Sequence, residues 1–461
     1  MLDLVIKNGK IVTENDVFDG EIGVSNGQIV QLAKSISDPA NRTVDAGHKL
    51  ILPGLVDSHT HMEMPLGGTV TADDFESGTV AAACGGVTTI IDFAMQAVGS
   101  TLLDTYALWR EKADPKVGID YSLHLAIRDA TKESLAQIKE LIKRGVMSFK
   151  LFTTYRKAQI MMSDINICRT MEEATKWGGL VGIHCENNDY IECLVSEYLA
   201  QGNVEPEYHA KSRPPTSEVE AVRRVLTLAE FAKAPMYVVH TSTAEAAESI
   251  AEARAKGQDA HSETCPHYLT FTDAAYKGAK GKYYVMSPPL RSADDVRALW
   301  YDLANGKINT VASDHCCYTL EQKDRGKEDF SKIPNGVPGT EVILPTLYSN
   351  GVAKGLITLQ RLVQVSSSNP AKQFGLYPGK GALSIGSDAD LVIFDPKKEM
   401  RLSKDNLHSK IDYSPYEDIT VKGYPWMTIS RGRVVYENGQ FTGRRGDGKY
   451  VPGKPNAQLR V

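Results

Sequence analysis

Histidine and aspartate side chains follow several apolar runs of the sequence, at a spacing that could bind a metal ion. His59 and His61 are two residues apart, so the alternation of a strand points both rings to one side. His184 and His240 each end a later apolar run, and Asp314 ends the last one. Neutral imidazole and carboxylate are common ligands of zinc-like metals. Each residue alone fits ordinary packing or, for Asp314, a helix N-cap, but together they favour a metal centre.

Lys150 lies within the apolar run 148–152, where a buried ammonium is costly and would repel a divalent cation. The ordinary interpretation is a lysine that reaches solvent from a strand end. The functional alternative is a carbamate formed with CO2, which turns the cation into an anion able to bridge two metals. Asp314 could bind a metal and also carry a proton from attacking water to a leaving nitrogen.

Other cysteine and histidine groups are weaker candidates for chemistry. His261, Cys265 and His267 would share one face of a regular strand, but we rank ordinary packing above metal binding there. Cys316 and Cys317 are adjacent and cannot easily form a strain-free disulfide, so we interpret them as free thiols.

Eight short apolar runs, many of them separated by helical patterns, would position these residues. A helix is predicted over residues 134–145, and the pair Ser217 and Glu220 predicts a capping box that opens another. This alternation favours an α/β fold, a TIM-like (β/α)8 barrel with catalytic residues at the C-terminal ends of its strands. An open doubly wound sheet is the alternative, but no GxGxxG follows a strand. The runs are 51–61, 87–93, 121–127, 148–152, 180–184, 236–240, 259–265 and 309–314.

Both ends of the chain have a different pattern, with short β-rich runs around Asn-Gly pairs that predict hairpins. We expect the two ends to form one small β-sandwich, with two separate small β domains as the alternative. The predicted domain limits are 1–52 and 379–442 for the two parts of the sandwich and 53–378 for the barrel. Residues 443–461 are predicted to form an exposed tail.

The overall composition excludes several classes of protein. The 461 residues carry 52 Lys and Arg against 57 Asp and Glu, a net charge of −5, which argues against a nucleic-acid or polybasic membrane-binding protein. No apolar run approaches the roughly 20 residues of a membrane helix, and no signal peptide is readable. Seven cysteines without a CxxC pair predict reduced thiols in a cytoplasmic protein.

Several motifs together resemble the cyclic amidohydrolases, and within them the dihydropyrimidinase/D-hydantoinase branch. The metal-binding motifs are Asp57-Ser58-His59-Thr60-His61, Ser148-Phe149-Lys150, His184-Cys185-Glu186-Asn187, Val239-His240-Thr241-Ser242 and Ser313-Asp314-His315. Stretches 64–69, 73–78, 286–291, 333–336 and 386–391 resemble the branch more narrowly. The resemblance covers nearly the whole chain.

This resemblance implies a barrel with two divalent metals, most often zinc, with manganese or cobalt as substitutes. His59 and His61 would hold the more buried metal, and His184 and His240 the second. Lys150, as the carbamate (N6-carboxylysine), and a hydroxide would bridge the two ions. Asp314 would bind the first metal and act as base, then as acid.

The resemblance also implies how a small cyclic ureide or imide would bind. Tyr155 would donate its hydroxyl to the developing oxyanion, and the backbones of Ser287 and Asn335 would hold the imide edge of the ring. Ring opening of hydantoins or dihydropyrimidines would yield N-carbamoyl amino acids. Family members are commonly homotetramers. Met62, Met64, Leu66 and Phe152 are apolar candidates for contact with the side group of the ring.

Departures from the branch pattern and three rivals stay open at this point. Ser58 and the pair Cys317-Tyr318 replace the usual Pro and Pro-Phe-like residues, and the loop 156–164 lacks the usual aromatic and Asp-Asp-Gly-like turn. Allantoinase ranks second, although its usual Glu-Pro-Gly is absent after His61. Dihydroorotase is less favoured because Glu63 would repel the substrate carboxylate. A non-catalytic scaffold should lack metal ligands, and none is missing.

Overall fold

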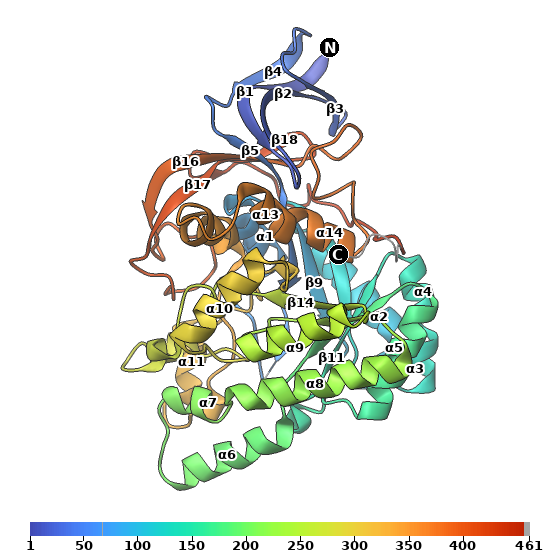
Figure 1. Cartoon of the computed structure of the whole chain (residues 1–461), viewed down its shortest axis with the longest axis vertical. Helices are drawn as coiled ribbons and strands as arrows, with labels where there is room; N and C mark the ends of the chain where they lie inside the picture. The colour runs from blue at the N-terminus through green and yellow to red at the C-terminus, as the bar shows by residue number, and fades with distance from the viewer. Residues whose placement is uncertain (67, 456–461) are drawn as a thin grey trace.

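A sheet of eight parallel strands forms the centre of the computed structural model, which describes residues 1–66 and 68–455 (Figure 1). Neighbouring strands of the sheet follow one another in the sequence, as in a TIM barrel. Each predicted apolar run contributes one strand. The strands are β6 (Leu55–Thr60), β9 (Val87–Met95), β10 (Asp120–Ala126), β11 (Ser148–Phe152), β12 (Leu180–His184), β13 (Met236–Val238), β14 (Ala260–Thr264) and β15 (Thr310–Val311).

The barrel closes beside the predicted metal ligands. The His61 backbone N–H donates to the His315 carbonyl at 3.0 Å, and the His315 N–H donates to the His59 carbonyl at 3.2 Å. These contacts join the end of β6 to the segment after β15. Every residue of the eight strands is buried, as expected where helices cover a parallel sheet. The closure therefore fixes the backbones that carry His59, His61 and Asp314.

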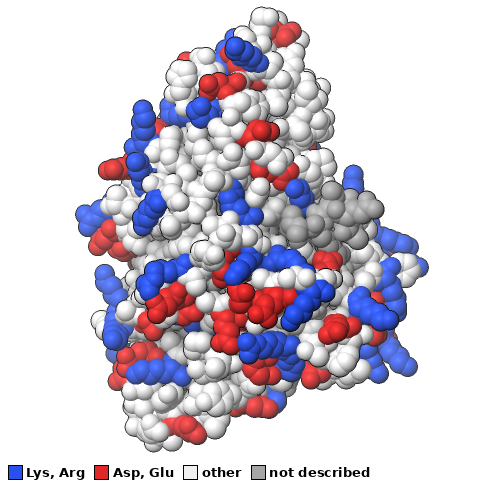
Figure 2. Space-filling view, viewed as in Figure 1, with Lys and Arg blue, Asp and Glu red and all other residues white. Residues whose placement is uncertain are grey.

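Helices cover the outside of the barrel, and on the face in Figure 2 their Lys and Arg side chains are interspersed with Asp and Glu. The helix predicted over 134–145 is present as two short helices, and Gly145 follows with a φ of 90°. The helices are α1 (Phe75–Cys84), α2 (Leu102–Ala113), α3 (Lys132–Ala136), α4 (Ile138–Lys143), α5 (Asp164–Lys176), α6 (Asn188–Ala200), α7 (Glu207–Lys211), α8 (Pro215–Ala232), α9 (Ala244–Ala255), α10 (Ala293–Ala304), α11 (Leu320–Lys323), α12 (Ile343–Thr346), α13 (Leu359–Val363) and α14 (Asn369–Gln373).

The capping box predicted at Ser217 is wrong, because α8 begins two residues earlier, at Pro215. Proline suits the first turn of a helix, where its missing N–H costs nothing. The Ser217 hydroxyl donates to the Pro214 carbonyl at 2.7 Å and caps no N–H. Among the described residues, no helix is both long and apolar enough to cross a membrane.

The two ends of the chain join in one nine-stranded sheet, which excludes two separate β domains (Figure 1). The join is β5, which pairs with β1 on one side and with β16 on the other. Apolar residues from both ends, including Ile11, Ile51 and Ile393, share one buried cluster. The strands are β1 (Leu2–Val12), β2 (Val17–Ser25), β3 (Gln28–Ala33), β4 (Ala40–Asp45), β5 (Leu50–Pro53), β16 (Leu391–Arg401), β17 (Thr420–Ser430), β18 (Arg433–Glu437) and β19 (Gln440–Phe441).

A buried lysine connects this terminal sheet to the barrel. Lys380 Nζ lies 2.6 Å from Asp120 Oδ2 at the start of β10, and 2.8 and 2.9 Å from carboxylate oxygens of Asp390 and Asp388, just before β16. We call these four residues the joint. The domain limits given above stay a prediction.

Part of the predicted tail forms backbone hydrogen bonds with the barrel. The Tyr121 N–H donates to the Lys449 carbonyl at 2.9 Å, and the Val451 N–H donates back to Tyr121 at 2.7 Å. The Gly453 N–H binds the Gly145 carbonyl at 2.9 Å. Backbone groups of this stretch therefore find partners at the start of β10 and beyond α4, while Arg444, Lys449 and Lys454 are exposed. Residues 456–461 of that tail, and Gly67, lie outside the described residues.

Candidate active site

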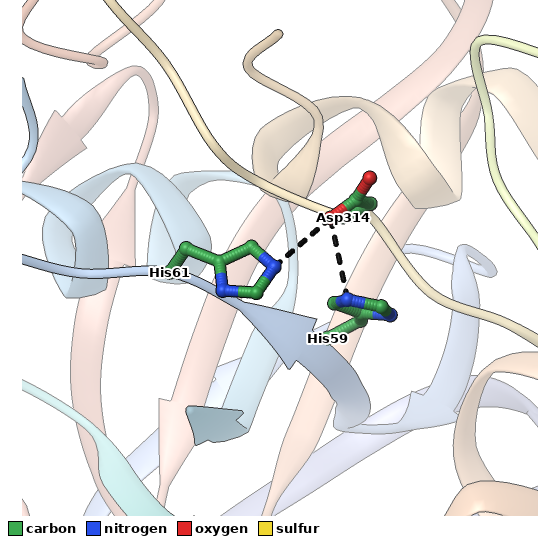
Figure 3. A group of neighbouring side chains, drawn as sticks. All are labelled: His59, His61 and Asp314. Atoms are coloured by element: carbon green, nitrogen blue, oxygen red, sulfur yellow. Dashed lines mark hydrogen bonds and ion pairs between the residues drawn. The ribbon is translucent and has the colours of Figure 1, made fainter. Parts of the chain in front are cut away.

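Three predicted metal ligands meet where the barrel closes (Figure 3). His59 lies near the end of β6, His61 follows that strand, and Asp314 follows β15. Asp314 Oδ1 lies 3.1 Å from His61 Nε2 and 3.3 Å from His59 Nε2. All three residues are buried or nearly so, and their ligand atoms form one group. This arrangement brings two imidazole nitrogens to one carboxylate oxygen.

The hydrogen bonds of His59 show that this group fits a cation. His59 Nδ1 lies 2.6 Å from Glu263 Oε1, which also accepts the His240 N–H at 3.1 Å. Glu263 Oε2 accepts the Tyr237 hydroxyl at 3.0 Å. Burial raises the pKa of Glu263 to about 7, but its donors favour the carboxylate. Burial lowers the pKa of His59 to about 3, so the ring is neutral and carries its proton on Nδ1. The Nε2 lone pair then faces an Asp314 oxygen, an arrangement that a metal ion between them would stabilise.

A second histidine pair ends β12 and follows β13. His184 Nε2 lies 2.7 Å from Glu186 Oε2, which places the ring proton there and leaves Nδ1 as an acceptor. Nδ1 faces His240 Nε2 at 3.0 Å. The buried Nδ1 atoms of His61 and His240 have no hydrogen-bond partner among the described residues. A carboxylate that orients a histidine while its other nitrogen is free is typical of a metal site.

Lys150 is buried on β11 with its side chain 2% exposed. Burial lowers the pKa of Lys150 to about 8, although Asp314 and Glu263 oppose the shift. Its charge in turn helps to lower the pKa of His59, His61, His184 and His240. A lowered pKa increases the fraction of neutral amine at neutral pH, and the neutral amine is the form that reacts with CO2.

Three site residues have a backbone conformation that side chains other than glycine seldom adopt. The φ angles are 68° at Tyr155, 38° at His240 and 46° at Asp314. Positive φ values in non-glycine residues concentrate at functional sites, where the surrounding fold imposes them. Here they occur where the chain leaves β11, β13 and β15, so they turn the chain at the point where each strand ends.

A cavity of 560 Å³ connects the predicted metal ligands with the predicted substrate contacts. Tyr155, Ser287 and Asn335 all line it, and Asn335 Nδ2 donates to Ser287 Oγ at 3.0 Å. Burial raises the pKa of Tyr155 to about 12, although Arg213 opposes the shift. The Tyr155 hydroxyl therefore stays protonated at neutral pH and can donate a hydrogen bond.

Part of the cavity wall is apolar, although Arg213, Arg325 and Lys332 also line the cavity. Of the four apolar candidates for the side group, Met64, Leu66 and Phe152 line the cavity, whereas Met62 is buried beside Gly78 and does not. Ala158 and Ile160 come from the altered loop, and Met95 and Ile333 complete this wall. A cavity of this size and lining suits a small ring with an uncharged substituent.

Glu63 occupies a place that the charge argument did not foresee. Its carboxylate pairs with Lys116 and does not line the cavity. The argument that Glu63 repels a substrate carboxylate is therefore wrong, because the side chain turns toward α1 and the segment after α2.

The weaker cluster contributes no ligand atom to the His59, His61 and Asp314 group, although Asp314 lies close enough to His267 to affect its pKa. His261, Cys265 and His267 form no group of three candidate ligand atoms among the described residues. His261 Nε2 lies 2.5 Å from Asp259 Oδ1, and Cys265 is part of the barrel core. The expectation of ordinary packing is consistent with these contacts.

Two carboxylates and an arginine at the site were missing from the sequence-based set. Glu263 orients His59, Glu186 orients His184, and Arg213 lines the cavity with its Nη1 3.5 Å from Glu186. Glu263 stands between His261 and Cys265 in the same alternation, so that pattern could have drawn attention to it. Arg213 follows α7 and has no such signal.

Known proteins resemble this chain over almost its whole length. The model of the Amidohydrolase family matches residues 50–435. A D-hydantoinase from Ralstonia pickettii is 41% identical over 98% of both chains, and a dihydropyrimidinase from Rattus norvegicus is 38% identical over 99% of this chain and 90% of that one. The crystal structure of a dihydropyrimidinase from Brevibacillus agri superposes with a TM-score of 0.97 at 41% identity, over 99% of this chain and all of the other. This chain belongs to the amidohydrolase family.

Proposed function

We propose that this protein hydrolyses a C–N bond in the ring of hydantoins and dihydropyrimidines and releases N-carbamoyl amino acids. The observation that carries this proposal is one cavity lined by the histidine pairs, Lys150, Asp314, Tyr155, Ser287 and Asn335. The names of the relatives, D-hydantoinase and dihydropyrimidinase, support the same reaction.

Two divalent ions fit the donor atoms at the site. His59, His61 and Asp314 would hold one ion, and His184 and His240 the other. Bound divalent ions lower the pKa of water and polarise a carbonyl, which are the two requirements of amide hydrolysis. We propose zinc, because a histidine-rich set suits it, with manganese and cobalt as substitutes.

Lys150 would reach both ions as a carbamate. The ammonium first loses one proton, and the neutral amine then forms an N–C bond with CO2 and releases a second, so a cation becomes an anion. This change removes the repulsion that the ammonium exerts on cations at the site, and it supplies oxygen ligands that the amine lacks.

Asp314 would move the proton that hydrolysis requires. It takes a proton from the attacking water as the new C–O bond forms, and it gives that proton to the ring nitrogen as the C–N bond breaks. His59 and His61 hold the pKa of Asp314 well below its usual range, although burial opposes them. The free carboxylate is therefore ready to accept a proton at neutral pH.

Tyr155 and two backbone segments would hold the ring. The Tyr155 hydroxyl donates to the carbonyl oxygen as it gains negative charge, an interaction that is strongest in the transition state. The backbone groups of Ser287 and Asn335 hold the imide edge, which hydantoins and dihydropyrimidines share. The apolar wall receives the substituent.

Ring opening on a panel of substrates tests this function. Protein purified with divalent metal and bicarbonate is assayed on dihydrouracil, hydantoin, D- and L-5-phenylhydantoin, allantoin and dihydroorotate. We expect turnover of dihydrouracil or the hydantoins, with allantoin and dihydroorotate inert. Turnover of allantoin alone would support the proposed hydrolysis and contradict the proposed substrates. The absence of both turnover and bound metal would indicate a non-catalytic scaffold.

Two further expectations stay predictions. Light scattering tests the homotetramer. The seven cysteines of the described chain form no disulfide, which supports a reducing compartment such as the cytoplasm. Subcellular fractionation tests that location.

A further inference from the structure

Lys323, at the end of α11, is completely buried and donates to three backbone carbonyls. Its Nζ lies 2.9 Å from the Val285 oxygen, 2.7 Å from the Pro334 oxygen and 2.8 Å from the Gly336 oxygen. An ammonium has three N–H donors, so these contacts use all of them.

The charge of Lys323 has no carboxylate partner. Among the described residues, no carboxylate oxygen lies within 4 Å of its Nζ, in contrast to Lys380, which has three carboxylate partners. The desolvation of the Lys323 charge is therefore not offset by an ion pair. Burial lowers the pKa of Lys323 to about 7. A methionine would fill similar space without this cost, so the hydrogen bonds to the carbonyls explain a lysine better than packing does.

The three carbonyls belong to two segments that are distant in sequence. Val285 lies two residues before Ser287, and Pro334 and Gly336 flank Asn335. The Gly336 N–H also donates to the Val285 carbonyl at 2.9 Å. Gly336 has a φ of 145°, and a Cβ at this position would lie 2.1 Å from the Cys316 carbonyl. The segment thus lies tightly between Val285 and the chain that follows Asp314.

We propose that Lys323 is a positioning residue that sets the spacing between the Ser287 and Asn335 segments, and through it the grip on the imide edge of the substrate. The inference rests on the proposed function for the role of those two segments. Lys323 touches neither the cavity nor a metal ligand. Its effect is therefore on substrate binding, not on metal binding or proton transfer.

Lys323→Met tests the proposal because it keeps the volume and removes the donors. We expect KM for the ring substrate to rise roughly tenfold, which corresponds to the loss of about one to two hydrogen bonds. The value of kcat should stay within roughly threefold of wild type, and the metal content should not change. Hydrogen exchange should become faster in peptides that cover 283–287 and 333–337.

Arg361→Met is the matched control. Arg361 donates to the backbone carbonyls of Leu303 at 2.7 Å and Ile308 at 2.6 Å, and it does not line the cavity. The Arg361→Met substitution removes a cation from these carbonyls, which lie outside the Ser287 and Asn335 segments. It should therefore lower stability without changing KM or hydrogen exchange in the two peptides.

A second variant covers the case in which Lys323→Met does not fold. In Lys323→Ala, propylammonium supplies the three missing carbons and the ammonium, and it should restore KM, whereas propanol should not. An unchanged KM with unchanged exchange in Lys323→Met, or equal rescue by propanol, would overturn the proposal. Hydrogen exchange can be measured without turnover. If the wild-type protein opens none of the rings but Lys323→Met still shows faster exchange in the two peptides, the positioning role is retained and the proposed function is rejected.

Discussion

Two buried lysines, one at the joint and one at the mouth of the barrel, lie in opposite electrostatic surroundings. Lys380 is 1% exposed and Lys150 is 2% exposed. Three carboxylates surround Lys380, and although burial opposes them, they raise its pKa above the usual value. Lys150 has no carboxylate oxygen within 4 Å among the described residues, and burial lowers its pKa to about 8.

This difference separates a structural ion pair, at Lys380, from a charged group without an anionic partner in the described chain, at Lys150. At the joint, Lys380 is neutralised by groups of the chain itself. At the mouth, Lys150 has no anionic partner among the residues that the structure describes, and the lone pairs of His59 Nε2 and Asp314 Oδ1 face each other at 3.3 Å. Groups that remain unsatisfied after folding mark the place where a ligand completes the structure.

The largest expected effect comes from Lys150→Ala. Without the proposed carbamate, the two ions would lose a shared anionic ligand, so we expect metal to be lost and activity to fall by about a thousandfold or more. Metal analysis and ring-opening assays measure both. Acetate should restore part of the activity, because its carboxylate can replace the carbamate.

Lys143→Ala provides the control on exposed α4 and should behave as wild type. A carbamate carbon signal after incubation with 13C-bicarbonate should be present in wild type and absent in Lys150→Ala. A fully active, metal-replete Lys150→Ala protein would refute the carbamate.

Tyr155→Phe should lower kcat by about 100- to 1,000-fold, because one donor to the developing oxyanion is lost. Metal content and KM should change little. Steady-state kinetics measure the effect, and Tyr190→Phe, an exposed tyrosine on α6, serves as control. A wild-type kcat in Tyr155→Phe would show that a group other than Tyr155 stabilises the oxyanion.

Lys380→Met should lower the free energy of unfolding by about 3–5 kcal/mol, because it leaves the buried Asp390 carboxylate without its ion pair and Asp120 with Arg431 alone. Urea unfolding measures the loss, and KM of the folded variant should match wild type. Lys10→Met removes an exposed ion pair with Asp19 and should cost less than about 1 kcal/mol. Equal losses in the two variants would contradict the importance of the joint.

The smallest expected effect is a pH-dependent one at His408, in the segment between β16 and β17. A hydrogen bond of 2.8 Å to Glu341 raises the pKa of His408, although burial opposes it. A raised pKa stabilises the fold fully below the ordinary value and loses this contribution as pH rises through the raised value. The stability gap between wild type and His408→Gln should be about 1 kcal/mol at most at pH 6 and smaller at pH 8.5, as measured by urea unfolding. A stability gap that grows as pH rises would contradict a raised pKa of His408.

The barrel was predictable because its strands are buried on both faces and read as short apolar runs. The ends of those strands were less predictable. β13 ends at Val238 and β15 at Val311, whereas the runs continue to His240 and Asp314. Positive φ values at His240 and Asp314 turn the chain there. Asp and His adopt such values more often than most residues, but only in a small minority of cases, so their presence in a run does not mark the end of a strand.

The candidate ligands followed from spacing, whereas the residues that orient them did not. His59 lies near the end of β6 and His61 directly follows that strand, so local alternation was enough to place them together. Glu263 orients His59 from β14, on the other side of the closing seam, and Lys323 joins segments that have no common periodicity. Such contacts depend on the curvature of the closed barrel, which no local pattern encodes.

The pairing of β5 with β16 also dictates the order in which the molecule can be completed during synthesis. The first five strands leave the ribosome early, but the partner edge of β5 emerges only after the entire barrel has been made. At a synthesis rate of about 5–20 residues per second, this edge waits on the order of tens of seconds. An unpaired edge is prone to pair with other chains, so the nascent N-terminal strands are where a chaperone would have most to protect.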